Sequence, residues 1–451
     1  MQCRMKNITP QKLIAFVVLA LLGVGAIGCV SFFADKCISI GGDKKGILEG
    51  TTVIWGMFDT GEQVDTMKGG HKIEYIQIPE EDFEERLVNA IAEGKGPDVV
   101  YIRNSWLPKL QSKLIPFQNT DLPAFAEYRN TFVDVAVQDF VRDGPGNTKL
   151  LYAVPLYVDT LALYWNRDIF NGVGITEPPV SWEEFSRMVP KLRLLSIEGK
   201  IIRAGAAIGT ARNINRSSDI VSMLMLQAGT KMVADDRKSA TFSSCAAVSG
   251  KPVCSARSAL QFYTDFANDT SSVYTWSNAF DYSIDAFVND KAAMMINYAH
   301  QLPLVKQRRP ELNFRVAPIP QPHVRLDEKL PVTYANYMGL AVPLGAQNPK
   351  VSWQFILDAT GLQSSEAYLH ATGRPPARID LIDAFAQDPD FSIFVRQALT
   401  ASSWYQPDAR KVDDIFADMI DSVVGGTQTS EQALGRAEAE VSILLKQLLA
   451  R

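Results

Sequence analysis

An aromatic ring and a carboxylate interrupt a strongly apolar stretch of the chain. Residues 154–156 predict a strand that ends where proline removes a ladder donor, and residues 160–165 predict a second strand buried on both faces. Tyr157 and Asp159 lie between these two strands. A ring and a carboxylate at such a junction indicate a place where two lobes meet. This arrangement favours binding over catalysis.

The residue patterns that catalysis requires are missing from the sequence. The four histidines have no partner at a useful spacing, and no G-x-S-x-G, H-E-x-x-H or phosphate-binding loop occurs. The paired carboxylates at 80–81 and 183–184 begin predicted helices, where the helix dipole already explains them. We therefore expect no catalytic residue, metal or cofactor, and we expect that the protein is not an enzyme.

Length and charge limit the class of protein. The 451 residues exceed what one hydrophobic core usually fills, so two lobes are expected. The net charge is −5, and no basic patch with interleaved aromatic residues occurs, so no nucleic-acid partner is expected.

The N-terminal region, residues 1–34, predicts a signal or membrane anchor. Three basic residues precede the uncharged run 13–34, which as a helix would be about as long as a bilayer core is thick. This order predicts that everything after the run, beginning with a polar tether at 35–47, lies outside the cytoplasm. Residues 26–29 resemble a lipobox, in which Cys29 would be lipidated. An uncleaved anchor explains the long apolar run better, and free secretion is a third alternative.

Cysteine usage agrees with export. Cys245 and Cys254 flank a loop with serine, glycine and proline, so a disulfide is expected in an oxidising compartment. Two unpaired thiols are the alternative, and the sequence leaves open whether Cys37 pairs.

Short strands and helices alternate after the tether. A strand at 52–55, a strand at 72–78, a helix at 81–92 and a strand at 98–102 are joined by short loops. This pattern predicts a parallel sheet with ligands at the carboxyl ends of its strands. The remaining chain predicts mostly helices, with strands at 294–297, 314–318 and 337–343. The sequence therefore indicates an α/β fold.

Five blocks occur in the order and at the spacing of one known family. They are residues 53–55, 94–100, 151–185, 281–297 and 337–343. With these blocks the chain resembles the family 1 extracellular solute-binding proteins, the receptor subunits of ABC importers, and among them the maltose-binding type. The resemblance implies a two-lobe, type II periplasmic-binding-protein-like fold, in which each lobe is a sheet flanked by helices and hinge strands join the lobes.

The resemblance also implies where the lobes begin and end. The first lobe would hold residues 48–158 and 318–345, and the second would hold 159–317 and 346–451. The lobes would close on the ligand by a hinge motion, and the closed protein, expected to be a monomer, would be presented to ABC permease subunits in the membrane.

Candidate ligand-binding residues follow from the predicted strand ends and from the family pattern. Asp159 stands where relatives of the maltose type carry a carboxylate that binds hydroxyl groups. At positions 299–300 this chain has Ala-His where the family often has a stacking tryptophan. The full set of candidates is Asp59, Thr60, Asn104, Trp106, Tyr157, Asp159, Arg212, Asn213, Trp276, Asn297, Tyr298, Asn336, Tyr337 and Trp404, with Tyr282, Arg374 and Tyr405 as weaker ones.

These residue types suit a sugar, which offers apolar faces to rings and hydroxyl groups to carboxylates, amides and arginine. The expected function is therefore a receptor that binds a carbohydrate for ABC import. A polyamine or another small polar solute is an alternative, because Asp59 and Asp159 could each pair with an amine. A sensory receptor of the same fold and a polysaccharide-active enzyme are further alternatives.

Overall fold

The computed structural model describes residues 50–117, 122–248, 251–328 and 331–450. The expected anchor, the lipidation candidate Cys29 and most of the tether lie outside these residues. Within the described part of the chain, no helix is both long and apolar enough to cross a membrane.

The first hydrophobic core forms around a five-stranded sheet with the order β2-β1-β3-β16-β6. Strands β1 (Thr52–Gly56), β2 (Ile73–Gln77) and β3 (Val99–Arg103) are parallel, as the sequence predicted. Strand β16 (Met338–Ala341) runs antiparallel to β3 and to β6 (Val154–Pro155), so the expectation of a purely parallel sheet is wrong. The reason is connectivity, because β16 enters the sheet only after the chain has passed through the other lobe.

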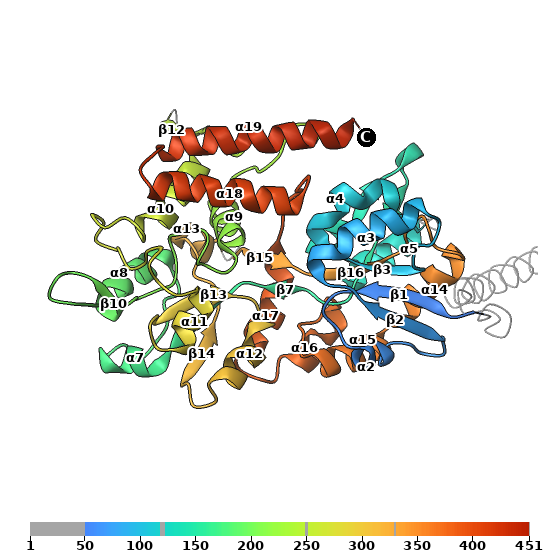
Figure 1. Ribbon diagram of the computed structural model, residues 1–451, viewed down its shortest axis with the longest axis horizontal. Helices are drawn as coiled ribbons and strands as arrows, with labels where there is room; N and C mark the ends of the chain where they lie inside the picture. Colours follow the sequence, from blue (N-terminus) through green and yellow to red (C-terminus); the bar gives the residue numbers. More distant parts are fainter. Residues whose placement is uncertain (1–49, 118–121, 249–250, 329–330, 451) are drawn as a thin grey trace, which may run out of the picture. The chain divides into compact units, whose positions relative to one another are not determined.

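Helices from both halves of the chain pack on this sheet (Figure 1). They are α2 (Gly61–Asp65), α3 (Glu80–Ala92), α4 (Leu107–Leu110), α5 (Leu122–Thr131), α6 (Asp134–Phe140), α14 (Pro349–Ala359), α15 (Leu362–Thr372) and α16 (Ile382–Phe385). Buried side chains such as Phe83, Tyr101, Phe140, Phe355 and Tyr368 fill the space between sheet and helices.

The second core surrounds a three-stranded sheet with β8 (Ala162–Asn166) at its centre. Strands β13 (Met294–Asn297) and β14 (Phe314–Ala317) flank β8, and both run antiparallel to it. All five residues of β8 are buried, as its nearly all-apolar sequence predicted. The surrounding helices are α7 (Arg167–Gly172), α8 (Trp182–Leu192), α9 (Ser217–Gln227), α10 (Ser255–Asp265), α11 (Ser283–Val288), α12 (Gln301–Arg308), α18 (Ala409–Val424) and α19 (Ser430–Leu449).

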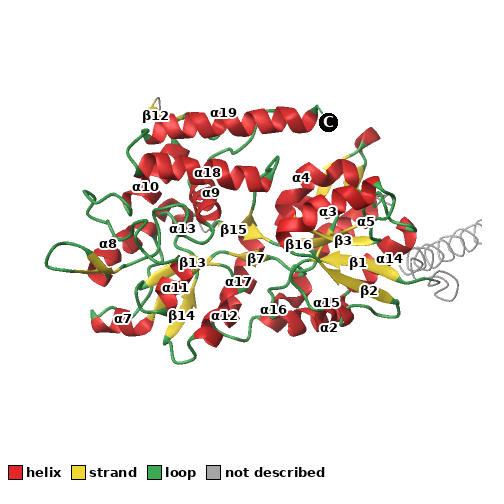
Figure 2. Cartoon of the chain, viewed as in Figure 1, coloured by secondary structure: helices red, strands yellow, loops and turns green. Residues whose placement is uncertain are grey.

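A small sheet of three short strands joins the two lobes, and Figure 2 labels two of these strands, β7 and β15. Strands β7 (Asp159–Thr160), β15 (Thr333–Asn336) and β17 (Ala401–Ser402) form one small sheet with the order β17-β15-β7. Each strand belongs to a different passage of the chain between the cores. The hinge is therefore one hydrogen-bonded unit.

The observed cores divide the chain differently from the expected boundaries. The second lobe was expected to include everything after residue 346, yet Trp353, Phe355, Tyr368 and Phe385 pack in the first core. Residues 318–345 were expected in the first lobe, yet Ile319 belongs to the second core. The reason is the third crossing, because the chain leaves the first lobe for the last time only near β17.

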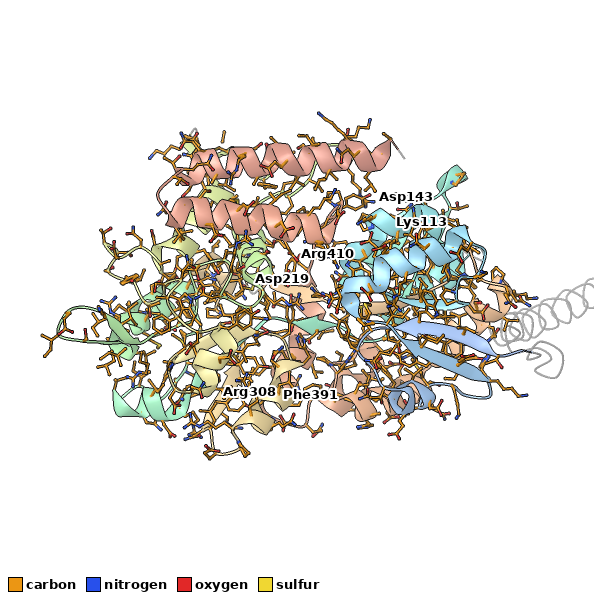
Figure 3. All side chains as sticks on the ribbon, viewed as in Figure 1. Lys113, Asp143, Asp219, Arg308, Phe391 and Arg410 are labelled. Carbon is orange, nitrogen blue, oxygen red and sulfur yellow. A yellow bond between two sulfur atoms is a disulfide. The ribbon has the colours of Figure 1, made fainter. Side chains whose placement is uncertain are left out.

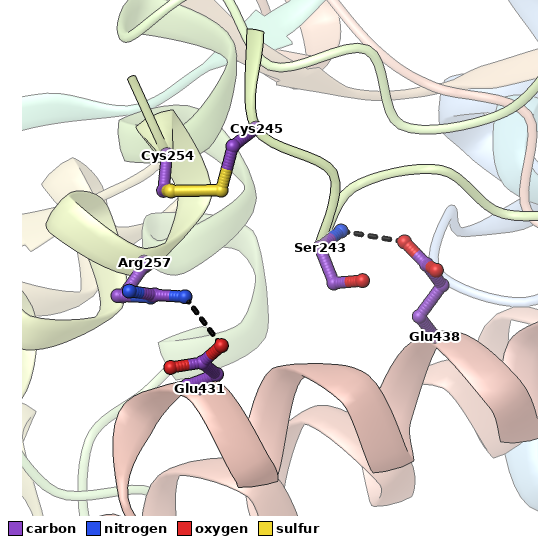
Figure 4. Close-up of a disulfide and its surroundings, with 6 residues drawn as sticks. All are labelled: Ser243, Cys245, Cys254, Arg257, Glu431 and Glu438. Atoms are coloured by element: carbon purple, nitrogen blue, oxygen red, sulfur yellow. Dashed lines mark hydrogen bonds and ion pairs between the residues drawn. A yellow bond between two sulfur atoms is a disulfide. The ribbon is translucent and has the colours of Figure 1, made fainter. Parts of the chain in front are cut away.

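A disulfide joins Cys245 to Cys254 and closes the hairpin of β11 (Ala246–Val248) and β12 (Lys251–Val253) (Figure 4). Beside it, Arg257 of α10 forms a 2.8 Å ion pair with Glu431 of α19. The hairpin thus lies beside a contact between two helices of the second lobe.

Candidate functional site

A cavity of about 110 Å³ lies between the two lobes. The first lobe contributes α3, α4 and the end of β3, the second contributes α9 and α18, and the hinge contributes β15. The residues that line it are Glu80, Glu84, Arg103, Asn104, Ser105, Trp106, Lys109, Arg216, Asp219, Tyr334, Ala335, Asn336, Gln406, Asp408, Ala409, Arg410 and Asp413. Figure 3 labels two of them, Asp219 and Arg410.

Arg103 enters the cavity from the last position of the buried strand β3. Its residue surface is 7% exposed, and it donates a hydrogen bond from Nη2 to Glu80 at the start of α3. Its guanidinium carbon lies 5.6 Å from the centre of the Phe58 ring and 5.8 Å from that of Trp106. Its buried Nε has no hydrogen-bond partner in the described part of the chain. Burial lowers the pKa of Arg103, and the positive charge of Arg216 lowers it further.

Arg216 faces the same cavity from the other lobe, at the N-cap of α9. Its backbone has φ 62° and ψ 33°, a left-handed conformation that costs a non-glycine residue about 1–2 kcal/mol. Its guanidinium carbon lies 5.9 Å from the centre of the Tyr298 ring. Burial lowers the pKa of Arg216, but the charge of Asp219 and other acidic groups outweighs burial and raises it.

Two carboxylates of α9 and α18 lie beside Arg216. Asp219 is buried and accepts a 2.8 Å hydrogen bond from the Tyr298 hydroxyl. Asp413 keeps considerable solvent access, yet partial burial and then the negative charge of Asp219 raise its pKa to about 7. Arg216, Asp219 and Asp413 also line a second hollow of about 350 Å³, so the two hollows adjoin.

One lysine connects the two lobes at the cavity. The Nζ of Lys109 in α4 lies 2.5 Å from a carboxylate oxygen of Glu84 and 2.8 Å from one of Asp408. Glu84 belongs to the first lobe, whereas Asp408 is the N-cap of α18 in the second. The ion pair between Lys109 and Asp408 therefore crosses the cavity.

Asn104 and Tyr337, both candidate ligand residues, are bound to a buried carboxylate of the first lobe. Asp139 of α6 accepts hydrogen bonds from the Asn104 amide at 2.8 Å, the Tyr337 hydroxyl at 2.8 Å and the Ser403 hydroxyl at 2.5 Å. Burial raises the pKa of Asp139, and these three donors act against that effect. The carboxylate thus links the end of β3 to the second and third crossings.

Asp159 lies on the first crossing and is used to position the start of α12. Its carboxylate accepts hydrogen bonds from the amides of Ala299 at 2.8 Å and His300 at 3.2 Å, and it lies 3.0 Å from Nδ1 of His300. The Asp159 residue is 2% exposed, whereas the His300 side chain is 41% exposed and stacks on Tyr298. Asp159 therefore holds a histidine that is itself open to solvent.

A second charged cluster lies at the first-lobe end of the crossing. Asp59 is fully buried, 2.8 Å from the guanidinium of Arg374, and accepts a hydrogen bond from Tyr368 at 2.8 Å. Arg374 lies 4.4 Å from the centre of the Tyr157 ring, and burial raises the pKa of Tyr157 to about 12. Thr60, the neighbouring candidate, instead caps α2 by accepting a hydrogen bond from Gln63.

Several candidates contribute to packing in the second lobe. Trp276 is fully buried, stacks on Phe280 and donates to the side chain of Asn213. Trp404 is buried and donates to Ser222. Arg212 forms ion pairs with Asp418 and Asp421 of α18, and Asn297 is buried. For Trp276 the sequence left a ring platform and core packing equally open; the structure gives both Trp276 and Trp404 as core residues, whereas Trp106 and Asn336 do line the cavity.

The sequence reasoning missed Arg103, Arg216, Asp219 and Asp413. A usable signal existed for Arg103, because a cation that ends a fully apolar strand must find a partner or a ligand. The left-handed backbone at Arg216 has no such signal in the sequence.

The family of the chain follows from its sequence. Residues 62–357 match the family described as bacterial extracellular solute-binding protein. The chain belongs to this family. This solute-binding protein accordingly has an extracytoplasmic location.

Individual relatives are distant. A binding protein of Brucella abortus is 23% identical over 252 residues, which are 56% of this chain and 56% of that protein. The multiple sugar-binding protein of Streptococcus mutans is 23% identical over 228 residues, 50% of this chain and 51% of that protein. The chain thus spans about half the length of the curated relatives it matches.

A solved structure shares the fold of this chain over almost the full length of the solved chain. The sugar-binding protein MalE from Xanthomonas citri is 21% identical, with a TM-score of 0.69, and the match covers 88% of this chain and 98% of that one. The two-lobed, type II fold expected for this solute-binding protein is therefore confirmed.

Proposed function

We propose that this protein is an extracytoplasmic receptor of an ABC importer that binds a carbohydrate in the cavity between its lobes. The observation that carries the proposal is the lining of that cavity, to which both lobes and the hinge contribute polar side chains. Carboxylates, guanidinium groups and the Asn336 amide lie there beside the ring of Trp106. Hydroxyl groups and the apolar face of a sugar ring are suitable partners for such a set.

The proposed mechanism has no chemical step. A ligand that touches Arg103 and Arg216 at once binds the closed form of the protein better than an open form. Binding therefore increases the fraction of closed molecules. Permease subunits would then recognise the closed form of the monomer. Attachment to the membrane, by an anchor or by lipid on Cys29, would keep the receptor beside the permease.

The names of relatives support the sugar class. The Streptococcus mutans relative is described as a multiple sugar-binding protein, and MalE of Xanthomonas citri as a sugar-binding protein. We extend that class to this chain because its own cavity offers the matching groups.

Isothermal titration calorimetry of the full-length protein in a mild detergent tests the proposal. The panel contains neutral sugars, acidic sugars, polyamines and amino acids. We expect a sugar to bind, and Trp106→Ala to weaken that binding at least about tenfold, because one ring can contribute about 1.5 kcal/mol of contact energy. Arg308→Ala is the control, since Arg308 forms an exposed ion pair with Asp285 away from the cavity.

Binding of a polyamine without binding of any sugar would contradict the carbohydrate assignment. Hydrolysis of the bound sugar by the purified protein would contradict the absence of a chemical step. Neither result depends on which sugar is preferred.

A further inference from the structure

Two arginines face the interlobe cavity from opposite lobes with unused hydrogen-bond donors. Arg103 is 7% exposed, and its Nε has no hydrogen-bond partner in the described part of the chain. The guanidinium of Arg216 makes no hydrogen bond or ion pair with any residue that the structure describes; it lies over the Tyr298 ring, and the residue is partly exposed, so its donors are accessible to a ligand or to water. A guanidinium carries five N–H donors in a planar fork, and leaving the buried Nε donor of Arg103 unpaired away from water is costly.

The carboxylates in the cavity wall do not fill this need. Glu80 accepts from Nη2 of Arg103, but Nε stays without a partner. Glu84 and Asp408 are paired with Lys109, and Asp219 accepts from Tyr298. Asp219 and Asp413 act on Arg216 through their charge, but among the described residues neither lies within ion-pair distance of it.

The two guanidinium groups also repel each other. Arg103 and Arg216 line one small cavity from opposite lobes, and the charge of Arg216 accordingly lowers the pKa of Arg103. An oxyanion between them would accept hydrogen bonds from both, and would turn a repulsion between the lobes into an attraction. Arginine binds carboxylate and phosphate groups through two parallel hydrogen bonds, and such charge-assisted bonds are stronger than neutral ones.

The backbone at Arg216 is consistent with a role in binding. A left-handed arginine is strained, and such strain is concentrated at ligand sites, where the surrounding structure holds it in place. On the other side, the rings of Phe58 and Trp106 flank the guanidinium of Arg103 and fix its direction. Both arginines are thus positioned before a ligand arrives.

We propose that the ligand of this cavity is an acidic sugar, and that its oxyanion lies between Arg103 and Arg216. The inference rests on the proposed function, because it names the class of carbohydrate that the same cavity takes. The oxyanion is a carboxylate, as in a uronic acid, or a phosphate, as in a sugar phosphate.

Matched pairs of sugars test the inference on the full-length protein by titration calorimetry. Galacturonate and digalacturonate are compared with galactose and galactobiose, glucuronate with glucose, and glucose 6-phosphate with glucose. We expect an acidic sugar to bind about 10- to 100-fold more tightly than its neutral counterpart, the range given by one or two hydrogen bonds to a charged group. A preference for the uronates identifies the carboxylate as the source, and a preference for glucose 6-phosphate identifies the phosphate.

Variants of Arg216 link the preference to the site. Arg216→Gln is expected to reduce the acidic-to-neutral ratio to below about threefold, whereas Arg216→Lys keeps a charge and retains part of the ratio. Arg103→Gln is expected to act in the same direction, and its circular dichroism spectrum reports whether it folds. Arg308→Gln is the charge-matched control outside the cavity and should leave the ratio unchanged.

Three outcomes would overturn the inference. Neutral sugars that bind as tightly as acidic ones overturn it and leave the proposed function standing. A preference for acidic over neutral sugars that survives in Arg216→Gln also overturns it. The third outcome is inorganic phosphate that binds as tightly as the sugars, because no sugar would then be needed. If no sugar of any kind binds, the proposed function fails together with the inference.

Discussion

The backbone of Arg216 places a charge in the cavity at a cost to stability. Helix α9 begins at a residue with φ 62°, where a glycine would be unstrained. At an ordinary helical position a glycine variant is less stable than an alanine variant. If the glycine variant at 216 is instead the more stable one, the backbone there is strained.

We predict that Arg216→Gly is more stable than Arg216→Ala by about 1 kcal/mol, because the alanine must keep the left-handed conformation with a Cβ. Both variants lose the guanidinium, so the comparison isolates the backbone. Urea denaturation monitored by circular dichroism measures the difference. If the alanine variant is the more stable one, the strain at this position is not real.

The affinity for an acidic ligand should depend on pH through Asp413. Its pKa of about 7 means that this carboxyl group is largely neutral below pH 7 and negative above it, beside Asp219, Arg216 and Arg103. A negative Asp413 repels an oxyanion in the cavity that it lines. We therefore predict that affinity falls as pH rises through about 7, and that Asp413→Asn removes this step.

The raised pKa of Asp413 also makes the stability of the folded protein depend on pH. Its pKa is raised in the folded state, so between about pH 4 and pH 7 the folded protein holds a proton that the unfolded chain has lost. Asp413 therefore contributes to stability at low pH, and this contribution is lost as pH rises through 7. Ligand titration at pH 6 and pH 8 checks the affinity, and urea denaturation between about pH 4 and pH 8 checks the stability, each with the original protein and with Asp413→Asn. An Asp413→Asn variant that keeps the full pH dependence would contradict them.

At the scale of elements, the crossing strand β7 organises a helix of the other lobe. The Asp159 carboxylate accepts hydrogen bonds from the backbone amides of Ala299 and His300 at the start of α12, and its contact with Nδ1 orients the His300 ring. The sequence made this carboxylate a ligand candidate, with a hinge hydrogen bond as the alternative. The observed contacts give it a positioning role, and contact with a ligand stays a prediction.

We predict that Asp159→Ala lowers the free energy of unfolding by about 2–4 kcal/mol, since the buried amide of Ala299, the partly buried amide of His300 and an imidazole lose their acceptor. Thermal or urea denaturation measures the loss. Asp168→Ala is the matched control, because Asp168 is exposed and accepts one hydrogen bond from Asn313. A variant at 159 as stable as the one at 168 would refute the positioning role.

The sequence predicted the main strands of both cores and several of the longer helices to within a few residues, because hydrophobic period, caps and prolines act locally. The helix expected at 81–92 is α3, and the strand expected at 294–297 is β13. Burial of single aromatics was not predictable. Trp106 borders the cavity while Trp276 and Trp404 are core, and this difference arises only when distant segments pack. The antiparallel strand β16 and the third crossing depend on distant segments in the same way.

At the scale of the whole molecule, one direct ion pair among the described residues joins the lobes at the cavity, in addition to the hinge. Lys109 reaches Asp408 in the other lobe while it also pairs with Glu84 in its own. The side chain of Lys109 is partly exposed, so salt will weaken this link.

We predict that Lys109→Met increases the fraction of open molecules without ligand, because the link between α4 and α18 is lost. Dyes attached through unnatural amino acids at Ser112 and Lys306 report lobe separation by single-molecule energy transfer, and transfer should fall. Added salt should have a smaller effect in the same direction on the original protein. Lys95→Met is the control, since Lys95 pairs with Glu93 within the first lobe. Equal transfer in both variants would show that the pair does not hold the lobes.

Asn104 connects the wall of the interlobe cavity directly to the hinge between the lobes. This residue lines the cavity, exchanges backbone and side-chain hydrogen bonds with Tyr337 on the second crossing, and donates to Asp139, which also holds Ser403 on the third. A force applied by a ligand to this amide therefore acts at once on the pivot about which the lobes turn. Substitutions that stiffen or loosen this hinge should change the affinity for the ligand even when the substituted residue does not touch the ligand. Ligand affinity and hinge flexibility are therefore coupled.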